Sequence, residues 1–138
     1  MHKQEMLRAT AENELLQFLG VEIVTAEPDR VVLTMEVTPR VHQYMGIMNG
    51  GVSMFLAETA ASIGVVAGQD LTRVTPVGIE INGNHLRAVS KGVITVEATP
   101  IYPGRTMSVW KIEITNDRDK LTFTGRITML MKPGSAPR

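Results

Sequence analysis

Residues 49–68 read NGGVSMFLAETAASIGVVAG, and this stretch decides the fold. It contains one charged residue among small and apolar side chains, and it is rich in Ala, Met and Leu, which favours a helix. Asn49 suits the N-cap, Gly50 and Gly51 open the first turn, and Gly68 ends the helix. A helix that is apolar on every side is either a membrane span or the buried middle of a domain.

The rest of the chain decides between these two possibilities. The one charge, Glu58, lies near the middle of the helix, where it would cost a few kcal/mol in lipid. Elsewhere apolar and polar residues alternate with the period of half-buried antiparallel strands. Five such strands are expected, at residues 31–37, 76–82, 93–99, 109–115 and 121–129. The sequence therefore predicts an α+β fold in which a curved antiparallel sheet wraps around a long central helix.

The connections between the predicted strands agree with this fold. Typical turn residues separate the runs, at Lys91-Gly92, Pro103-Gly104 and Asn116-Asp117. They predict that the last three strands form a meander. An amphipathic pattern over residues 1–19 predicts one short N-terminal helix, stopped by Gly20. The tail at 132–138 is rich in Pro, Gly and Ser, and we expect it to be frayed.

Length and composition limit the function classes. A chain of 138 residues with 43% apolar residues predicts one globular domain, residues 1–138. Lys and Arg number 14, as do Asp and Glu, and this balance argues against a nucleic-acid or anionic membrane partner. The absence of Cys removes disulfides, thiolate nucleophiles and Cys-based zinc sites. His2 and His42 lack ligand spacing with an acidic residue, so no metal is expected. No apolar leader is visible, which indicates a cytoplasmic protein.

The predicted chemistry centres on Glu58. Burying an unpaired carboxylate costs free energy, so a glutamate inside an apolar helix suggests a nucleophile or a general base. The alternative is that Glu58 faces solvent or a structural partner. Ser62 follows one helical turn later on the same face and is a candidate donor to Glu58 or to a bound water.

The N-terminus of the same helix supplies a complementary group. Free N–H groups at Gly50 and Gly51 suit an anion or a polarised carbonyl oxygen, although glycines there also permit tight packing. Gly50 and Glu58 are separated by about 12 Å of helix, at 1.5 Å per residue, so they cannot act on one carbon within one chain. A second copy across a two-fold axis would bring Gly50 of one chain near Glu58 of the other. We therefore predict an obligate homodimer with two composite sites.

Three stretches carry a resemblance to a known family. They are HQYMGIMNGGVSMFLAETAAS at 42–62, VGIEINGNHLRA at 77–88, and the segment from Pro100 to Ile114. Together they resemble the hotdog-fold thioesterase superfamily, in its 4-hydroxybenzoyl-CoA and PaaI-like branch, and the similarity covers nearly the whole chain. The resemblance implies a single hotdog domain assembled as homodimers, with dimers pairing into tetramers.

The resemblance also implies a reaction. It is the hydrolysis of a small acyl-CoA, of an aromatic, hydroxybenzoyl type, to the free acid and CoA. Glu58 would attack the thioester carbonyl or activate water, and the Gly50 N–H would hold the carbonyl oxygen. Gln43 would orient water or the thioester, with Ser62 assisting. By the same resemblance, Gln43, Asn49 and Gly50 come from one subunit, and Glu58 and Ser62 from its neighbour.

Position 49 departs from the family pattern. The subfamily that hydrolyses hydroxylated aroyl thioesters usually has His where this chain has Asn49. Asn donates an N–H to a carbonyl oxygen but carries no charge or proton near neutral pH. Asn49 is therefore either a hydrogen-bond donor to the substrate or only the helix cap, and the sequence leaves both readings open.

The CoA end of the substrate needs cations. His85 and Arg87 end one predicted strand, and Arg105 and Thr106 follow the Pro103-Gly104 turn. These four residues are candidates to meet the CoA phosphates, although each also reads as an ordinary surface residue, and His85 more readily as a structural histidine. CoA would be part of the substrate, and no separate cofactor is expected.

Three other functions fit parts of this pattern. One is hydrolysis of acyl groups carried by the phosphopantetheine arm of a protein. A second is a non-catalytic acyl-CoA binding module, against which the retained Glu58 counts. The third is a hydroxyacyl-thioester dehydratase, which relies on a site His, whereas position 49 and the central helix have none.

Overall fold

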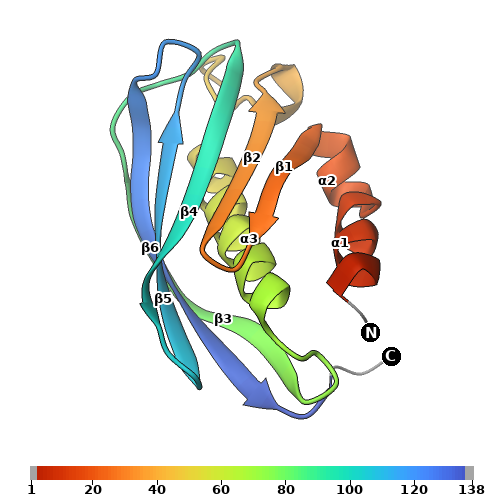
Figure 1. Ribbon diagram of the computed structural model, residues 1–138. Helices are drawn as coiled ribbons and strands as arrows, with labels where there is room; N and C mark the ends of the chain where they lie inside the picture. Colours follow the sequence, from red (N-terminus) through yellow and green to blue (C-terminus); the bar gives the residue numbers. More distant parts are fainter. Residues whose placement is uncertain (1–2, 136–138) are drawn as a thin grey trace.

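The structure, a computed structural model, describes residues 3–135 (Figure 1). Its helices are α1 (Lys3–Ala11), α2 (Glu14–Leu19), the short 3-10 helix η1 (Pro39–Val41) and α3 (Gly50–Gly68). Its strands are β1 (Val21–Glu27), β2 (Arg30–Glu36), β3 (Val74–His85), β4 (Val93–Pro103), β5 (Met107–Thr115) and β6 (Leu121–Pro133). All pairings are antiparallel, in the order β1-β2-β4-β5-β6-β3.

The sheet curves around α3, which confirms the predicted hotdog arrangement (Figure 1). The predicted apolar faces of four strands form the core, at Val31, Leu33, Met35, Ile94, Val96, Ala98, Trp110, Ile112, Ile114, Phe123, Ile127 and Met129. Small residues on α3 allow the sheet to approach closely, and the ring of Trp110 lies directly over Gly64. β4, β5 and β6 form the predicted meander.

Helix α3 begins and ends where the sequence predicts. Asn49 is its N-cap, and its last helical residue is Gly68. Among residues 3–135 it is the one helix long and apolar enough to cross a membrane by length and composition. Here, however, one side of α3 is buried against the sheet through residues such as Leu56, Ala57 and Ala60. It is the core helix of the domain.

The N-terminal segment differs from the prediction of one helix. It forms two helices, because the Oδ1 of Asn13 accepts hydrogen bonds from the N–H groups of Leu15 (3.1 Å) and Leu16 (3.3 Å) and so starts α2 anew. Gly20, with φ of 74°, ends α2 as predicted. The cap residue was overlooked because the apolar pattern continues across it.

Strand β1 was also missed, so the sheet has six strands and not five. Its alternation is interrupted by a register shift between Ile23 and Thr25, which breaks the period-two pattern. The turn between Glu27 and Arg30 contains Pro28, a typical turn residue that would have indicated a hairpin.

The expectation of a frayed tail is wrong for its first residues. β6 continues to Pro133 because β3 is long enough to pair with it, and Lys132 lies opposite Thr75. The hydroxyl of Thr75 also donates to the Gly134 carbonyl oxygen at 2.7 Å. Residues 136–138 of the predicted tail lie outside the described residues.

Strand β3 lies at one edge of the sheet and departs from its predicted alternation. A register shift between Gly78 and Glu80 turns Ile79 outward, where it is 55% exposed. Regular alternation over residues 76–82 would instead place Ile79 on the same apolar face as Val77 and Ile81. The bulge matters for the site, because it sits where β3 passes Glu58 of α3.

Candidate functional site

The N-terminus of α3 presents a free backbone donor. As the first residue of the helix, Gly50 has no intrahelical acceptor for its N–H. The Oδ1 of Asn49 accepts from the next N–H, that of Gly51, at 2.8 Å. Asn49 therefore caps the helix while its Nδ2 group remains available to donate. The Gly50 N–H and the Asn49 amide form a donor pair at the positive end of the helix.

Gln43 is held close to this donor pair by a tight loop. Its backbone N–H donates to the Ile47 carbonyl oxygen at 2.8 Å, and its Oε1 accepts from the N–H of Met45. Since Oε1 is engaged, the Nε2 amide is the group that Gln43 offers to a ligand. A cleft of about 350 Å³ connects Gln43, Gly50 and Ser53 with His85 and Arg87.

His85 lies over the start of α3. A Cβ built on Gly50 would lie 2.8 Å from Nε2 of His85, so the imidazole covers the Gly50 backbone. The ring also packs against Phe123, with centroids 5.5 Å apart. His85 and Arg87 thus line the same cleft as Gly50 and Gln43, so four predicted site residues come together there.

Glu58 is not buried within the chain, contrary to the prediction. It is exposed, because it lies on the side of α3 that faces away from the core. The apolar surroundings read from the sequence belong to its helical neighbours Leu56, Ala57, Ala60 and Ala61, which are buried. Within one chain, the reading that Glu58 faces solvent is therefore correct.

The carboxylate of Glu58 nevertheless packs closely against the backbone of β3. A Cβ on Gly78 would overlap Oε1 of Glu58 and would lie 3.2 Å from its Cδ and 3.5 Å from its Cγ. The side chain of Glu58 therefore crosses the bulge of β3 at Gly78, which has no Cβ to block it. A Cβ at position 78 would therefore force the end of the Glu58 side chain to move.

A hollow of about 300 Å³ opens beside Glu58. Its wall is mostly apolar, and α1 contributes Leu7 and Thr10 to it. Ser62 lines the same hollow, as its spacing from Glu58 predicted, but its hydroxyl donates to Sδ of Met129 at 3.9 Å and not to the carboxylate. The α1 residues were missed because nothing in their sequence distinguishes them from an ordinary amphipathic helix.

The predicted site residues thus fall into two groups on one chain. Gln43, Asn49 and Gly50 lie at the start of α3, and Glu58 and Ser62 lie about 12 Å further along it or more, at 1.5 Å per residue. The grouping is the same as the division between subunits that the family resemblance implies. One chain carries the donors and the carboxylate in separate places.

The four predicted CoA-binding residues do not come together within one chain. His85 lies opposite Phe123 near the start of β6, whereas the Thr106 carbonyl oxygen accepts from the N–H of Met131 near its end. About 26 Å of strand separates these ends, at roughly 3.3 Å per residue. Arg105 and Thr106 are therefore remote from the cleft at Gly50, because β5 begins beside the end of β6 whereas β3 ends beside its start.

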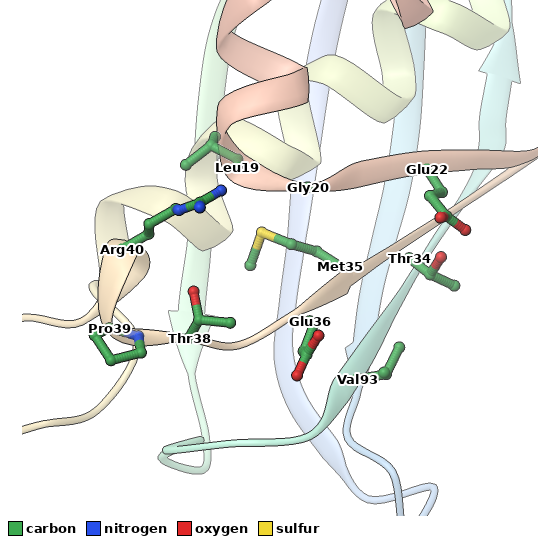
Figure 2. A pocket seen from close by; sticks show the side chains of 10 residues that line it. All are labelled: Leu19, Gly20, Glu22, Thr34, Met35, Glu36, Thr38, Pro39, Arg40 and Val93. Atoms are coloured by element: carbon green, nitrogen blue, oxygen red, sulfur yellow. The ribbon is translucent and has the colours of Figure 1, made fainter.

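Another cavity, of about 650 Å³, lies on the outer side of the sheet and contains none of the predicted residues (Figure 2). The carboxylates of Glu22 and Glu36 line it. Arg40 extends toward the end of α2, where it donates to the Phe18 carbonyl oxygen at 2.9 Å. The two carboxylates of this cavity disfavour a phosphorylated ligand. Although the cavity is large, we therefore do not take it as the candidate site.

Comparisons with known proteins show which family the chain belongs to. Residues 45–123, more than half of the chain, match the sequence model of the thioesterase superfamily. The 1,4-dihydroxy-2-naphthoyl-CoA hydrolase of Listeria monocytogenes is 41% identical over 118 residues, which cover 86% of this chain and 95% of that protein. The proofreading thioesterase EntH of Cronobacter turicensis is 36% identical over 126 residues, which cover 90% of each protein.

The fold is shared with a solved thioesterase. The crystal structure of a mutant of thioesterase PA1618 from Pseudomonas aeruginosa superposes with a TM-score of 0.87 at 33% identity, covering 94% of this chain and 93% of the other. The alignments with these two relatives cover nearly the full length of each relative. The region that matches the family model, residues 45–123, includes the start of α3 and Glu58. The chain therefore belongs to the thioesterase superfamily and is a thioester hydrolase of the hotdog fold.

Proposed function

We propose that this protein hydrolyses a compact, aromatic acyl-CoA to the free acid and CoA, at two composite sites of a homodimer. The observation that carries this proposal is the division of the site on one chain, with donors at Gly50 and a carboxylate at Glu58 on different parts of α3. Its sequence relative in Listeria, a hydrolase of an aromatic acyl-CoA, supports the same substrate class.

The roles follow from the chemistry of thioester hydrolysis. The Gly50 N–H of one subunit holds the carbonyl oxygen, and one such donor stabilises the oxyanion by about 3 kcal/mol. The free amide groups of Gln43 and Asn49 stand beside it to orient the thioester or water.

Glu58 of the other subunit has two routes to the same products. As a general base, its carboxylate takes a proton from the water that attacks the carbonyl carbon. The C–S bond then breaks, and the CoA sulfur leaves with a proton. As a nucleophile, its oxygen attacks the carbon and expels the CoA sulfur, and water hydrolyses the resulting mixed anhydride.

The size and lining of the hollow beside Glu58 favour a compact acyl group as substrate. Leu7, Phe55 and Val66 give it an apolar wall, and its volume is about 300 Å³. Since a cavity of about 150 Å³ accommodates benzene in another protein, this space suits a one-ring or two-ring acyl group better than a long fatty chain. A hydroxybenzoyl-type acyl group fits this description.

The exposed edge of β3 supports the homodimer. Within the described residues, β3 pairs with β6 on one side, and its other side is unpaired along twelve residues. An unpaired strand of this length is a template for a second strand, and a two-fold axis would join two copies edge to edge. The association would cover Ile79 and the exposed face of Glu58. Pairing of dimers into a tetramer remains part of the proposal.

The test is an assay of thiol release from a panel of aroyl and alkyl thioesters of CoA and of a phosphopantetheinylated carrier protein. We expect aroyl-CoA to be the best substrate and Glu58→Ala to lose at least ~100-fold in rate. Glu58→Gln preserves shape and should lose a similar factor. Activity of Glu58→Gln equal to that of the unmodified protein would refute the assignment. Tight CoA binding without turnover of any thioester would favour a binding module.

A further inference from the structure

A further cavity, of about 370 Å³, lies next to the cleft at Gly50. It is formed by the loop that joins β3 to β4 and the turn that joins β5 to β6. Four cations line it, namely Arg87, Lys91, Arg118 and Lys120, together with one carboxylate, Asp117. We call this the basic cavity. In a chain whose formal net charge is zero, four of the 14 Lys and Arg residues gather there.

The loop on one side of the basic cavity is fixed by the rest of the fold. The N–H groups of Leu86 and Arg87 donate to the Thr122 carbonyl oxygen at 2.8 and 3.3 Å. The N–H of Met48 donates to the Val89 carbonyl oxygen at 2.7 Å, and Nε2 of His42 to that of Ser90 at 2.8 Å. The backbone that carries Arg87 and Lys91 is therefore anchored at several points.

The turn on the other side is fixed by Asn116. Its Oδ1 accepts hydrogen bonds from the N–H groups of Arg118 and Lys120, both at 3.0 Å. The turn and the loop also contact one another, since a Cβ on Gly92 would overlap the carboxylate of Asp117. Gly92 has a φ of 86°, which other residues rarely adopt. The two segments that supply the cations are thus held in contact before any ligand binds.

The cations are available to a ligand. Among residues 3–135, ion pairs within 4.0 Å join Lys3, Arg8, Arg30 and Lys111 to carboxylates, and none of the four cations of the basic cavity takes part in one. All four are exposed. Unpaired cations around a concave surface focus the field on an anion that enters it.

The basic cavity is continuous with the candidate active site. Arg87, Ala88 and Val89 line both the cleft at Gly50 and the basic cavity. A thioester whose carbonyl oxygen lies at the Gly50 N–H would therefore have its thiol portion directed along this shared wall. The part of CoA at the far end of its pantetheine arm is a diphosphate attached to an adenosine 3′-phosphate, which is strongly anionic.

We propose that the basic cavity binds the phosphate groups of CoA, with Lys91, Arg118 and Lys120 as phosphate-binding residues beside Arg87. This inference rests on the proposed function, because it takes the substrate to be a CoA thioester. These residues replace Arg105 and Thr106 of the same chain, which lie at the opposite end of β6, as the candidates to bind the phosphates of a CoA thioester held at Gly50. Charge-assisted contacts of this kind favour a phosphorylated carrier over an unphosphorylated one.

The experiment compares two substrates with one acyl group, an acyl-CoA and the corresponding acyl-pantetheine, which lacks the phosphates. In the double variant Lys91→Gln/Lys120→Gln, we expect KM for acyl-CoA to rise by about tenfold and KM for acyl-pantetheine to stay unchanged. Lys132→Gln makes the same kind of change at the other end of β6 and is the matched control. Its KM for both substrates should equal that of the unmodified protein.

Calorimetric titration with free CoA and with 3′-dephospho-CoA measures binding apart from hydrolysis. The double variant should bind CoA about tenfold more weakly, and the loss should be smaller for 3′-dephospho-CoA. Unchanged KM and Kd for the CoA compounds would overturn the inference. An equal rise in KM for acyl-pantetheine would also overturn it, as would a loss confined to Arg105→Gln. If no thioester is hydrolysed, the proposed function fails, and the titration still decides where CoA binds.

Discussion

The carboxylate of Glu58 occupies the space that a Cβ on Gly78 would take. The contact joins the middle of α3 to the bulge of β3, and it fixes where the only charge of the helix can point. Because the overlapping atom is the end of a flexible side chain, adding a methyl group at position 78 would displace the carboxylate more than the backbone.

This relationship predicts the effect of Gly78→Ala. We expect kcat to fall by about 10-fold to 100-fold, since misplacing a catalytic group by about 1 Å costs on that order. KM should change much less, and the thermal unfolding midpoint should stay within a few degrees. Thiol-release kinetics and calorimetry measure the three quantities. Unchanged kcat in a variant that carries the extra methyl group would show that the position of Glu58 is not set by Gly78.

Substitutions at Asn49 distinguish its two roles. Asn49→Asp retains an N-cap oxygen for the Gly51 N–H but removes the amide donor and adds negative charge. We expect unchanged or slightly raised stability together with a kcat lower by about tenfold or more. Asn49→Ala should destabilise the helix by about 1 kcal/mol.

Asn49→His completes this series. A rate equal to or above that of the unmodified protein would identify position 49 as a donor to the substrate. Full activity in Asn49→Asp would instead leave Asn49 with the cap alone. Urea unfolding reports the cap and kcat reports the donor, so the two roles are read independently.

Hybrid dimers test the composite site. Gln43→Ala and Glu58→Gln should each be nearly inactive as pure dimers. In an equal mixture that exchanges subunits, half of the dimers are hybrids with one intact site of two, so about a quarter of the full activity should return. If Gln43 and Glu58 act from the same chain, no hybrid contains an intact site and the mixture stays inactive. Activity is measured after the two variants are unfolded and refolded together.

A larger residue in α1 should change acyl preference. Leu7 lines the hollow beside Glu58, and Leu7→Trp would reduce the space for the acyl group. We expect kcat/KM for a two-ring acyl-CoA to fall by about tenfold relative to a small alkyl-CoA. Leu15→Trp adds the same bulk at an exposed position of α2 and should not alter the ratio. An equal loss for both substrates would place the acyl group elsewhere.

The free energy of unfolding should depend on the buried apolar face of β4, β5 and β6. Ile112 is fully buried between β4 and β6 and packs in the main core. Ile112→Ala should lower the free energy of unfolding by about 2–5 kcal/mol, as for other large-to-small core substitutions. Urea unfolding at fixed protein concentration checks this. A loss below 1 kcal/mol would show that the sheet adjusts to fill the space.

Much of the fold was predictable because the signals are local. The cap, the end and the composition of the helix from Gly50 to Gly68 are all visible in its own sequence. Apolar and polar residues also alternate regularly in β5, which contains Trp110. β1 and the bulge of β3 escaped prediction because a single extra residue breaks the alternation on which strand recognition depends.

The sequence indicates candidate site residues, but it does not show their surroundings. The sequence identifies Glu58 as an unusual charge, yet exposure depends on which side of α3 meets the sheet, and this is set by residues far away in the chain. The same holds for the basic cavity, where Lys91 and Lys120 are neighbours only because β4, β5 and β6 are in register.

The break at Asn13 separates α1 from the rest of the N-terminal segment, and α1 supplies Leu7 and Thr10 to the hollow beside Glu58. Under the proposed function, the wall beside the acyl group therefore belongs to a peripheral helix, while the proposed reacting groups belong to α3. We therefore expect substitutions in α1 to alter which acids this scaffold releases while the proposed reacting groups stay unchanged.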